Sequence, residues 1–577
     1  MYPDTIFNWH DNSGIDNTST SVSNDSAPLL MQVFSADKGT EDLIEISGSD
    51  FDAMYGTMSF TRHGQSAIQA KNIIDAGGRL LAKRVVAEDS TLANVVLIAK
   101  VSDADSGVEV KWESKAIEGC KTFKEVKAAA EGLLNAEQGT FPIFVYSDNG
   151  RGVSGKSVRL NPDYNTSKGT GHTFYTLVVY EGTNIIEQVA ITADPDVIYG
   201  NTAYRLDEFT NVQISGVVLD ASYQLYAEKL ANELALDVDT VKSYDIVYGY
   251  TNKGDAIEGF KLSADSVDLD AANGIALAEG TNGAFGNAPV NTEAWTKAIV
   301  EVFKNESGDH DEVFDLDRHK IAAICDANYP VDVKNAIFEF VDFRKDCVFL
   351  RDFGTGLTTF AEINAKYNEF AEYHNYFTAD YSTSYMINDP TTKKTIEVTM
   401  MYDMAPLLVD HIINSPYAPL SGTSNGFVLK SAIKGTINFV PINTPKSNQK
   451  QAMDNIRVNY AVFEDNQCVV QSCYTCQDAY TQLSYLCNTM AIQRVLRAVR
   501  TACPRQRYSL STSTDLQTYA TAVNNVLSNY TNNFAQLNFK YTQDDLKASQ
   551  KIFYASIEFA FLGWAQTEIF DVYAINN

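Results

Sequence analysis

A glycine-rich segment at residues 150–157 is the first candidate for chemistry in this sequence. It reads Gly-Arg-Gly-Val-Ser-Gly-Lys-Ser and matches the phosphate-binding pattern G-x-x-x-x-G-K-[ST] at every position. In such a loop, backbone N–H groups surround the phosphates, the lysine neutralises them, and a helix begins directly afterwards. Here a β-type run that ends at Asn161-Pro162 follows instead, although Asp326 after an apolar run is a formal acidic partner. We expect a structural turn between two strands, with a P-loop NTPase as the alternative.

The cysteines and histidines do not form a recognisable metal or catalytic pattern. Cys473 and Cys476 have CxxC spacing and are flanked by Cys468 and Cys487, but no histidine follows His411 to complete a compact zinc site. We expect these cysteines to be small structural residues, and whether Cys473 and Cys476 bind anything stays open. We likewise expect a solvated loop, without EF-hand order, at the acidic cluster around His310 and His319. This cluster consists of Asp309, Asp311, Asp315 and Asp317. We expect no catalytic residue, metal or cofactor.

A basic cluster near the C-terminus is the most distinctive charge pattern. Its arginines lie within fourteen residues, and no acidic residue occurs between Asp478 and Asp515. Cations near a helix C-terminus are favoured by the helix dipole, which explains part of the pattern. The excess predicts contact with an acidic partner surface. The cluster consists of Arg494, Arg497, Arg500, Arg505 and Arg507.

Length and charge limit the classes of protein that fit. The chain has 577 residues, 45% of them hydrophobic, which indicates about three or four folded domains. Its net charge of −28 argues against a broad nucleic-acid or anionic-membrane surface. Residues 441–577 are nearly neutral, with 11 Lys/Arg against 10 Asp/Glu, so the two parts are expected to face different partners. We expect no membrane span, no signal peptide, and synthesis in a reducing cytoplasm.

The sequence predicts a multidomain α/β protein (α+β overall). We expect an extended N-terminal arm at 1–28, a core α/β domain in two parts at 29–138 and 239–440, and an inserted small β-barrel or sandwich-like domain at 139–238. An α+β domain at 441–562 and a C-terminal strand arm at 563–577 follow. The arms carry apolar strips that could add a strand to another sheet. These strips contain Ile6, Phe7 and Trp9 at one end, and Glu568, Ile569, Phe570, Val572 and Tyr573 at the other.

Alternation of apolar runs and helical patterns supports this division. Strands are expected at 29–34, 80–86, 321–326 and 347–351, with helices at 65–76, 295–304 and 331–344, as in a largely parallel sheet covered on both faces. A strand at 95–101 is assigned to the same core. Short β runs at 140–146, 157–160, 174–180, 185–191 and 212–219 predict an all-β insertion. In the last part, helices are expected at 478–502 and 515–530, and a strand at 551–561.

The order of several weak motifs resembles that of contractile phage tail sheath proteins. The opening order is Phe51 and Tyr55-Gly56, a helix, Gly77-Gly78, and a strand that ends at Arg84-Val85. The other matching segments, in chain order, are 174–180, 277–283, 373–381 and 404–420. Departures are Lys156 in place of an Asn, Glu279 in place of a Gly, and no Pro after Tyr381.

This resemblance implies a mechanical polymer and not an enzyme. It implies a subunit that stacks as hexameric rings around a tail tube, exchanges terminal arms with neighbouring copies, and contracts to drive the tube through a host envelope. The implied partners are other copies of the chain, the tube protein, and baseplate and tail terminator or neck proteins. The virion tail is the implied location, after assembly in the host cytoplasm. The C-terminal domain would face the tube and present the arginine cluster. A phage-derived bacteriocin or another contractile injection system is an alternative setting.

Overall fold

The computed structural model describes residues 28–562 with internal gaps. The gaps are 49–50, 106, 164–173, 193–203, 206–213, 219, 238–247, 250–255, 317, 416, 423–425, 503–512, 542–545, 548–551 and 554. The two terminal arms, with all of their predicted strand donors, therefore lie outside the described residues, as do Arg505 and Arg507. In the described part, no helix is both long and apolar enough to cross a membrane.

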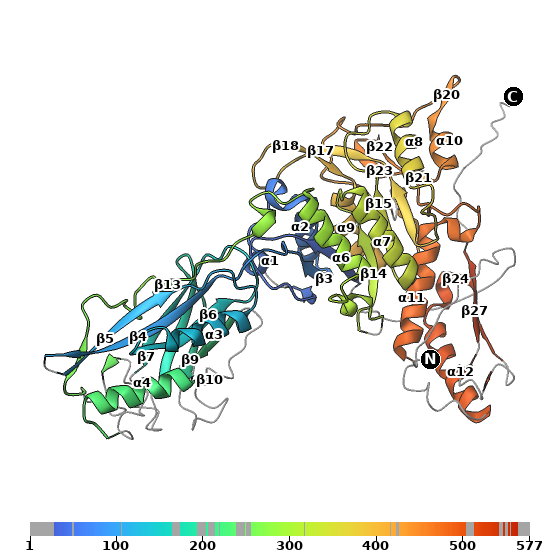
Figure 1. Ribbon diagram of the computed structural model, residues 1–577. Helices are drawn as coiled ribbons and strands as arrows, with labels where there is room; N and C mark the ends of the chain where they lie inside the picture. The colour runs from blue at the N-terminus through green and yellow to red at the C-terminus, as the bar shows by residue number, and fades with distance from the viewer. Residues whose placement is uncertain are drawn as a thin grey trace, which may run out of the picture.

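The larger of two lobes is built on a seven-stranded sheet in the order β2-β3-β1-β14-β15-β16-β21 (Figure 1). Every neighbouring pair is parallel except β2 with β3, so the predicted largely parallel sheet is confirmed. The strands are β1 Leu29–Phe34, β2 Ile44–Ser47, β3 Arg79–Arg84, β14 Ile321–Cys325, β15 Val348–Asp352, β16 Thr378–Tyr381 and β21 Val458–Asn459.

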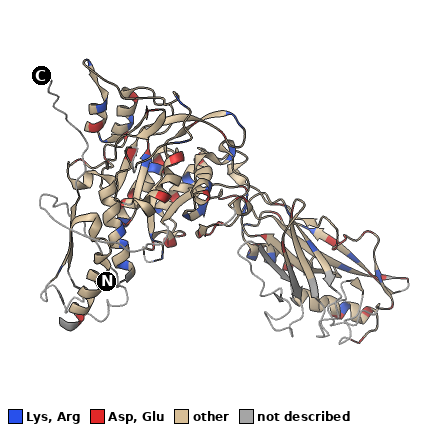
Figure 2. Ribbon diagram, turned by 180° about the vertical axis from the view of Figure 1, so that it is seen from behind, with Lys and Arg blue, Asp and Glu red and all other residues tan. Residues whose placement is uncertain are grey.

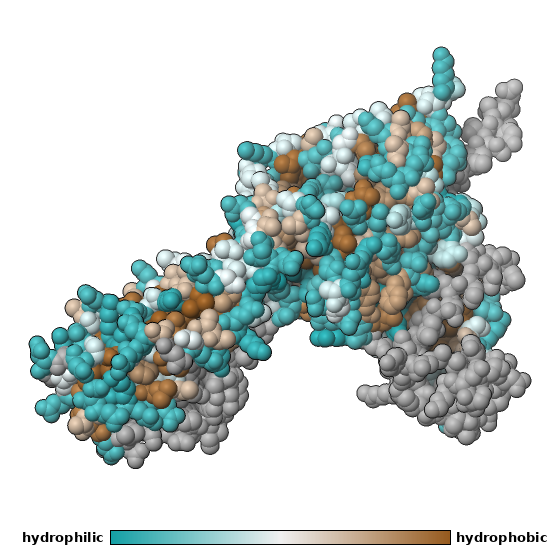
Figure 3. All heavy atoms as spheres, viewed as in Figure 1, coloured by the Kyte–Doolittle hydropathy of each residue, from teal (hydrophilic) through white to brown (hydrophobic). Residues whose placement is uncertain are grey.

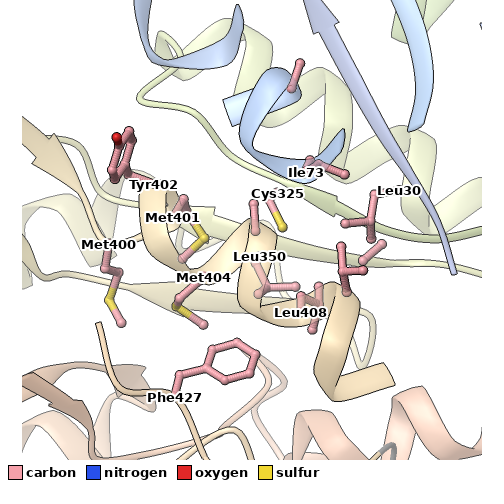
Figure 4. Packing of buried hydrophobic residues seen from close by; sticks show 14 of the residues in the cluster. Leu30, Ile73, Cys325, Leu350, Met400, Met401, Tyr402, Met404, Leu408 and Phe427 are labelled. Atoms are coloured by element: carbon pink, nitrogen blue, oxygen red, sulfur yellow. The ribbon is translucent and has the colours of Figure 1, made fainter. Parts of the chain in front are cut away.

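Helices cover both faces of this sheet because its strands are apolar on both sides. On β1, Leu30 and Phe34 belong to one buried cluster, whereas Met31 and Val33 belong to the cluster on the opposite face. In Figure 4, side chains from the sheet and from two helices converge in the first cluster. The helices of the first cluster are α2 (Phe60–Asp75) and α9 (Met401–Asn414), and those of the second are α6 (Glu293–Lys304) and α7 (Val331–Arg344).

The predicted start of α2 coincides with a break at Gly64. This residue has φ 71° and ψ −173°, so the regular helix resumes at Gln65, where the sequence predicted its beginning. A Cβ at Gly64 would also lie 3.1 Å from Val290, tighter than an ordinary contact. The break therefore serves the packing of α2 against the segment that precedes α6.

The smaller lobe pairs two five-stranded sheets around a shared apolar core. Their orders are β10-β9-β8-β7-β13 and β11-β6-β4-β5-β12, with α4 on the second sheet's inner side and α3 on its outer side. The strands are β4 Asn94–Ala104, β5 Gly107–Lys115, β6 Thr140–Asp148, β7 Lys156–Asp163, β8 Phe174–Glu181, β9 Asn184–Thr192, β10 Tyr204–Arg205, β11 Ile214–Val218, β12 Phe260–Leu262 and β13 Ile275–Ala276; the helices are α3 Phe123–Gly132 and α4 Asp220–Glu233.

Strand pairing differs from the predicted division of the chain. Strand β4 was assigned to the core, but it pairs with β5 and β6 in the smaller lobe, and β12 and β13 lie there as well. The cause is that β4 is buried on both faces: Val95 and Leu97 face the inner core, and Val96 and Ile98 face α3. Burial on both sides produces the same continuous apolar run as a central parallel strand. The helices α3 and α4 also mean that this lobe is not all-β.

The chain after residue 441 does not separate from the core where the sequence predicted. Strand β21 is the edge of the large sheet, and Val470 and Leu486 belong to its core cluster. Helix α11 begins at Leu486, eight residues later than expected, and leads to a small module with its own cluster. The elements of this part are β22 Ala461–Glu464, β23 Gln467–Val470, α11 Leu486–Ala502, α12 Ser513–Ser528, β24 Phe534–Lys540, β25 Leu546–Lys547, β26 Ile552–Phe553 and β27 Ser556–Phe561.

Short elements complete the larger lobe at its surface. They are α1 Phe51–Tyr55, α8 Phe360–Glu369, α10 Gln449–Asn455 and the hairpins β17–β18 (Ser384–Asn388, Thr395–Thr399) and β19–β20 (Asn443–Thr444, Ser447–Asn448). Acidic and basic residues are intermixed over both lobes in Figure 2. The face in Figure 3 is largely hydrophilic, with separate hydrophobic patches on both lobes.

Candidate functional site

The junction between the two lobes is the candidate functional site, because the chain crosses it twice. The chain leaves the larger lobe after β3 and returns before α6 (Figure 1). The outgoing and returning segments pair with each other through bridges from Thr91 to Thr281 and from Asn94 to Ala278. The backbone N–H of Asn94 donates to the Ala278 carbonyl at 2.9 Å. The lobes are thus connected by two paired strands of chain.

Arg84, the last residue of β3, ties this crossing to both lobes. Its side chain is buried, and its guanidinium donates to three backbone carbonyls. The acceptors are Ala36 at 3.2 Å and Gly39 at 2.9 Å in the larger lobe, and Arg151 at 2.6 Å in the loop between β6 and β7. A guanidinium has its donors in a fixed fork, so it holds these three segments in one geometry.

Two ion pairs lie across the same junction. Arg151 donates from its Nε and Nη2 to the Glu41 carboxylate at distances between 2.5 and 3.1 Å, and its backbone N–H adds a bond of 2.9 Å. Lys38 Nζ contacts both carboxylate oxygens of Glu181 at 2.6 Å. Each pair joins the segment after β1 to the smaller lobe, and each is half-buried, where such pairs are less screened by salt than at the surface.

Protonation behaviour at the junction follows from this burial. Burial lowers the pKa of Arg84, and the Glu41 and Asp148 carboxylates oppose the shift. Burial would raise the pKa of Glu41, but the hydrogen bonds and charge of Arg151 outweigh it and lower that pKa. Glu41 therefore stays ionised in the neutral range, and a guanidinium keeps its proton in proteins, so the junction is a charged network held by complementary partners.

The glycine-rich segment 150–157 is the turn that enters this junction. It joins β6 to β7, so the predicted turn between two strands is confirmed. A Cβ at Gly150 would overlap the Gly39 carbonyl, and one at Gly152, which has φ 132°, would lie 3.0 Å from Arg84. These glycines permit close approach to the larger lobe, which explains their presence without a phosphate.

The lysine of the same segment is already paired within the lobe. Lys156 Nζ lies 2.6 Å from Asp148 Oδ1, and both side chains are buried. Ser154 Oγ donates to the other oxygen of Asp148 at 2.8 Å. The cation that would neutralise a phosphate thus neutralises a neighbouring carboxylate, and β7 follows where a nucleotide site needs a helix.

A small pocket of about 20 Å³ opens beside Arg84, with room for about one water molecule. It is lined by Asp37, by Arg62 and His63 from α2, and by Asn282 and Phe285 from the returning segment. His63 Nε2 lies 3.1 Å from Asp37, and Arg62 also pairs with Asp37. The pocket is too small for a nucleotide or another organic cofactor.

Asp326, the formal acidic partner of the glycine-rich segment, belongs to a separate buried network. It lies just after β14 and is 0% exposed, and its carboxylate is 2.6 Å from Lys334 Nζ, which also contacts Asp352 at 2.7 Å. Burial, with the nearby charge of Asp352, raises the pKa of Asp326 to about 7. Next to it, Arg351 pairs with Asp380 at 2.7 Å. This network ties the C-terminal ends of β14, β15 and β16 to α7.

The described arginines of the basic cluster make contacts within the chain. Arg494 donates to the Ile412 carbonyl at 3.2 Å, and its guanidinium lies 5.9 Å from the ring centres of both Tyr417 and Tyr530. Arg497 donates to the Asp346 carbonyl, and Arg500 is buried. The Arg497 contact holds α11 against the chain that precedes β15, and the Arg494 contact holds it against the C-terminal end of α9. Contact of the cluster with a tube stays a prediction.

Comparison with solved structures identifies the architecture. The sheath tail protein of Listeria innocua aligns with a TM-score of 0.50 and 8% identity, over 94% of this chain and 96% of that chain. This chain has the fold of a sheath tail protein. The sheath tail protein of Desulfitobacterium hafniense aligns with a TM-score of 0.43 and 10% identity, over 92% and 94%. The contracted helical sheath of the anti-feeding prophage aligns with a TM-score of 0.37 and 13% identity, over 49% of this chain and 76% of that chain. No family profile and no curated protein matches the sequence.

The residues that build the junction of this sheath fold were largely missed by the sequence. Arg84-Val85 was noted as the end of a strand, but Lys38, Glu41 and Glu181 were not singled out. The available signal was the pair of basic residues Lys83-Arg84 at the end of β3, after its apolar run, which is unusual for a strand with both faces covered. Its acceptors are backbone carbonyls, which have no sequence signature.

Replacing Arg84 by methionine should destabilise the junction. The carbonyls of Ala36, Gly39 and Arg151 would lose a charged donor, with an expected cost of about 3 kcal/mol in the free energy of unfolding. Chemical denaturation measures this loss, and limited proteolysis should show faster cleavage in the two crossing segments. Arg79→Met is the matched control, because Arg79 forms a half-exposed pair with Glu45, worth about 0–1 kcal/mol. Equal stability of the two variants would contradict the role of Arg84.

Replacing Lys156 by methionine should lower stability without removing any hydrolytic activity. The variant leaves Asp148 as a buried, unpaired charge, with an expected cost of about 3–5 kcal/mol. The double variant Lys156→Met/Asp148→Asn should recover part of that loss, as a double-mutant cycle measures. ATP hydrolysis is assayed in parallel. Turnover by the wild-type protein that disappears in Lys156→Met would favour the NTPase alternative instead.

Proposed function

We propose that this protein is the structural subunit of a contractile tail sheath. In this role it polymerises as stacked hexameric rings around a tail tube and contracts to drive the tube through a host cell envelope. The observation that carries the proposal is the fold, which aligns with a sheath tail protein along nearly the full length of both chains. A virion tail is the proposed location, after assembly in the host cytoplasm, and a bacteriocin or other contractile injection system is the alternative setting.

The junction suits a subunit that carries mechanical load. A sheath subunit must move as a solid body while its neighbours rotate around it. Arg84, the two ion pairs and the paired crossing segments fix the smaller lobe on the larger one with directional, half-buried contacts. Chemistry is not required of such a subunit, and we propose a protein without enzymatic activity, cofactor or metal.

The proposed partners are other copies of the chain, the tube protein, and baseplate and terminator or neck proteins. The tube, baseplate and terminator or neck partners follow from the proposed sheath role. We propose no nucleic-acid partner, because the net charge of −28 would repel a phosphate backbone.

Exchange of the terminal arms between copies is proposed to hold the polymer together. In the described part of the chain, β24 and β27 pair only with each other, and a lone pair of strands is marginally stable. Another strand would extend this sheet through backbone hydrogen bonds. The arms also fit by charge: residues 1–27 and 563–577 contain acidic residues and no Lys or Arg, whereas 441–562 has 11 Lys/Arg and 8 Asp/Glu. The proposed donors are 6–9 and 568–573.

The purified chain should form long, striated, hollow tubes, and loss of either arm should prevent this. Deletion of 1–25 or of 563–577 is expected to leave soluble, folded monomers, as sedimentation and negative-stain microscopy would show. Circular dichroism checks that each truncated chain is folded. Raising the salt concentration should weaken assembly of the full chain if acidic arms meet a basic module. Tubes formed equally well by both truncated chains would exclude the arm-exchange proposal.

We further propose that the basic cluster meets the tube through Arg505 and Arg507. Replacing Arg494, Arg497 or Arg500 by glutamate would also disturb folding, because these side chains contact the core. Arg505→Glu/Arg507→Glu is therefore the sharper variant, and it should reduce co-sedimentation with isolated tubes more than tenfold. Arg505→Lys/Arg507→Lys is the charge-matched control. Unchanged binding by the glutamate variant would remove the tube contact from the proposal.

A further inference from the structure

Two cysteines that do not form the CxxC pattern with each other, Cys473 and Cys487, meet in the core. Cys473 follows β23, and Cys487 lies in the first turn of α11. The segments that carry them are joined by an antiparallel bridge between Tyr474 and Tyr485, and the Leu486 N–H donates to the Cys473 carbonyl at 2.9 Å. Both side chains are buried in the same apolar cluster. The fold therefore brings these two thiols together around a thirteen-residue intervening segment, 474–486.

The two thiols are neighbours within hydrogen-bonding reach, and the backbone of Leu420, Leu486 and Cys487 surrounds the Cys473 thiol. The Cys473 sulfur thus lies at the N-terminus of α11, a helix of 17 residues, where a negative charge is stabilised. The hydrogen bond from Cys487 lowers the pKa of Cys473 despite its burial, whereas burial raises the pKa of Cys487.

The other described cysteines have different surroundings. Cys476 donates to the carbonyls of Tyr373 and Asn375 at 3.5 and 3.6 Å, so its thiol is engaged away from the helix end. Burial raises the pKa of the Cys325, Cys347 and Cys468 thiols. Cys476, although it shares CxxC spacing with Cys473, therefore has its thiol directed to other partners, and Cys487 is the neighbouring thiol of Cys473.

We propose that Cys473 and Cys487 form a dithiol that closes to a disulfide when the protein passes from a reducing to an oxidising environment. With glutathione disulfide as the oxidant, the Cys473 thiolate attacks one of its sulfurs and releases one glutathione thiolate, which takes up a proton. The Cys487 thiol then loses its proton and attacks the Cys473 sulfur of the mixed disulfide, releasing the second glutathione. Two cysteine thiols are oxidised and one glutathione disulfide is reduced to two thiols.

Access to the buried pair requires local opening of the intervening segment. Tyr480 within it is 68% exposed, and the segment consists of turns and one short 3₁₀ helix. Residues 478–482 in its middle are exposed or half-buried, whereas Tyr474, Cys476 and Leu483 are buried, so opening must release both ends of the segment from the core while the rest of the fold stays intact. Once closed, the disulfide would fasten the start of α11 to the chain that follows β23. The C-terminal module would then be covalently secured to the core.

Peptide mapping of the full-length wild-type protein tests the proposal directly. The chain is purified with dithiothreitol, equilibrated at graded ratios of reduced to oxidised glutathione, quenched by alkylation, and digested. The expected result is one disulfide-linked peptide pair that contains Cys473 and Cys487, with two of the eight thiols lost. The midpoint of thermal unfolding should rise on oxidation and return with dithiothreitol.

Matched serine variants separate this pair from the CxxC pair. Cys473→Ser and Cys487→Ser should lose the linked peptide and the thermal shift, whereas Cys476→Ser and Cys468→Ser should keep both. Mapping of the wild-type chain does not depend on whether these variants fold. A link between Cys473 and Cys476, or eight free thiols at the most oxidising ratio, would overturn the proposal. The test uses the isolated chain, so its outcome is independent of whether the protein forms a sheath.

Discussion

The guanidinium of Arg84 is the contact on which the arrangement of the two lobes depends. A buried cation is tolerated only when its donors are satisfied, and here the acceptors are supplied by backbone on both sides of the junction. The glycines of the 150–157 turn follow from the same requirement, because a side chain there would block the approach of Arg151 to the larger lobe. The match to a phosphate-binding loop is therefore a by-product of packing.

Elements with local signals were predicted closely from the sequence. Strand β1 and helix α7 have the predicted bounds, β14 ends one residue earlier than predicted, and β15 is shifted by one residue, because each is a strongly apolar or amphipathic run with clear ends. Elements defined by distant partners were not predicted. The sheet to which β4 belongs cannot be read from its composition, since burial on two faces looks the same in either lobe.

The candidate site was harder to predict than the fold because the hydrogen bonds of Arg84 are accepted by main-chain carbonyl groups. The basic cluster shows the same difficulty: contact of Arg494 and Arg497 with an external acidic surface stays a prediction, and both also donate to carbonyls within the chain, which the sequence did not indicate. A sequence reveals an excess of cations but not whether their acceptors belong to another molecule or to the ends of the chain's own strands. Main-chain carbonyl groups at the ends of elements are abundant hydrogen-bond acceptors. Because they are uncharged, a count of charged residues does not reveal them.

The double crossing between the lobes has a consequence for twisting. A lobe attached by one strand of chain can swivel about single bonds, whereas the segments around Thr91 and Thr281 run side by side and are bridged. Such a paired ribbon cannot swivel freely about single bonds without breaking its bridges. A force applied to the smaller lobe would therefore reach the large sheet through both segments together.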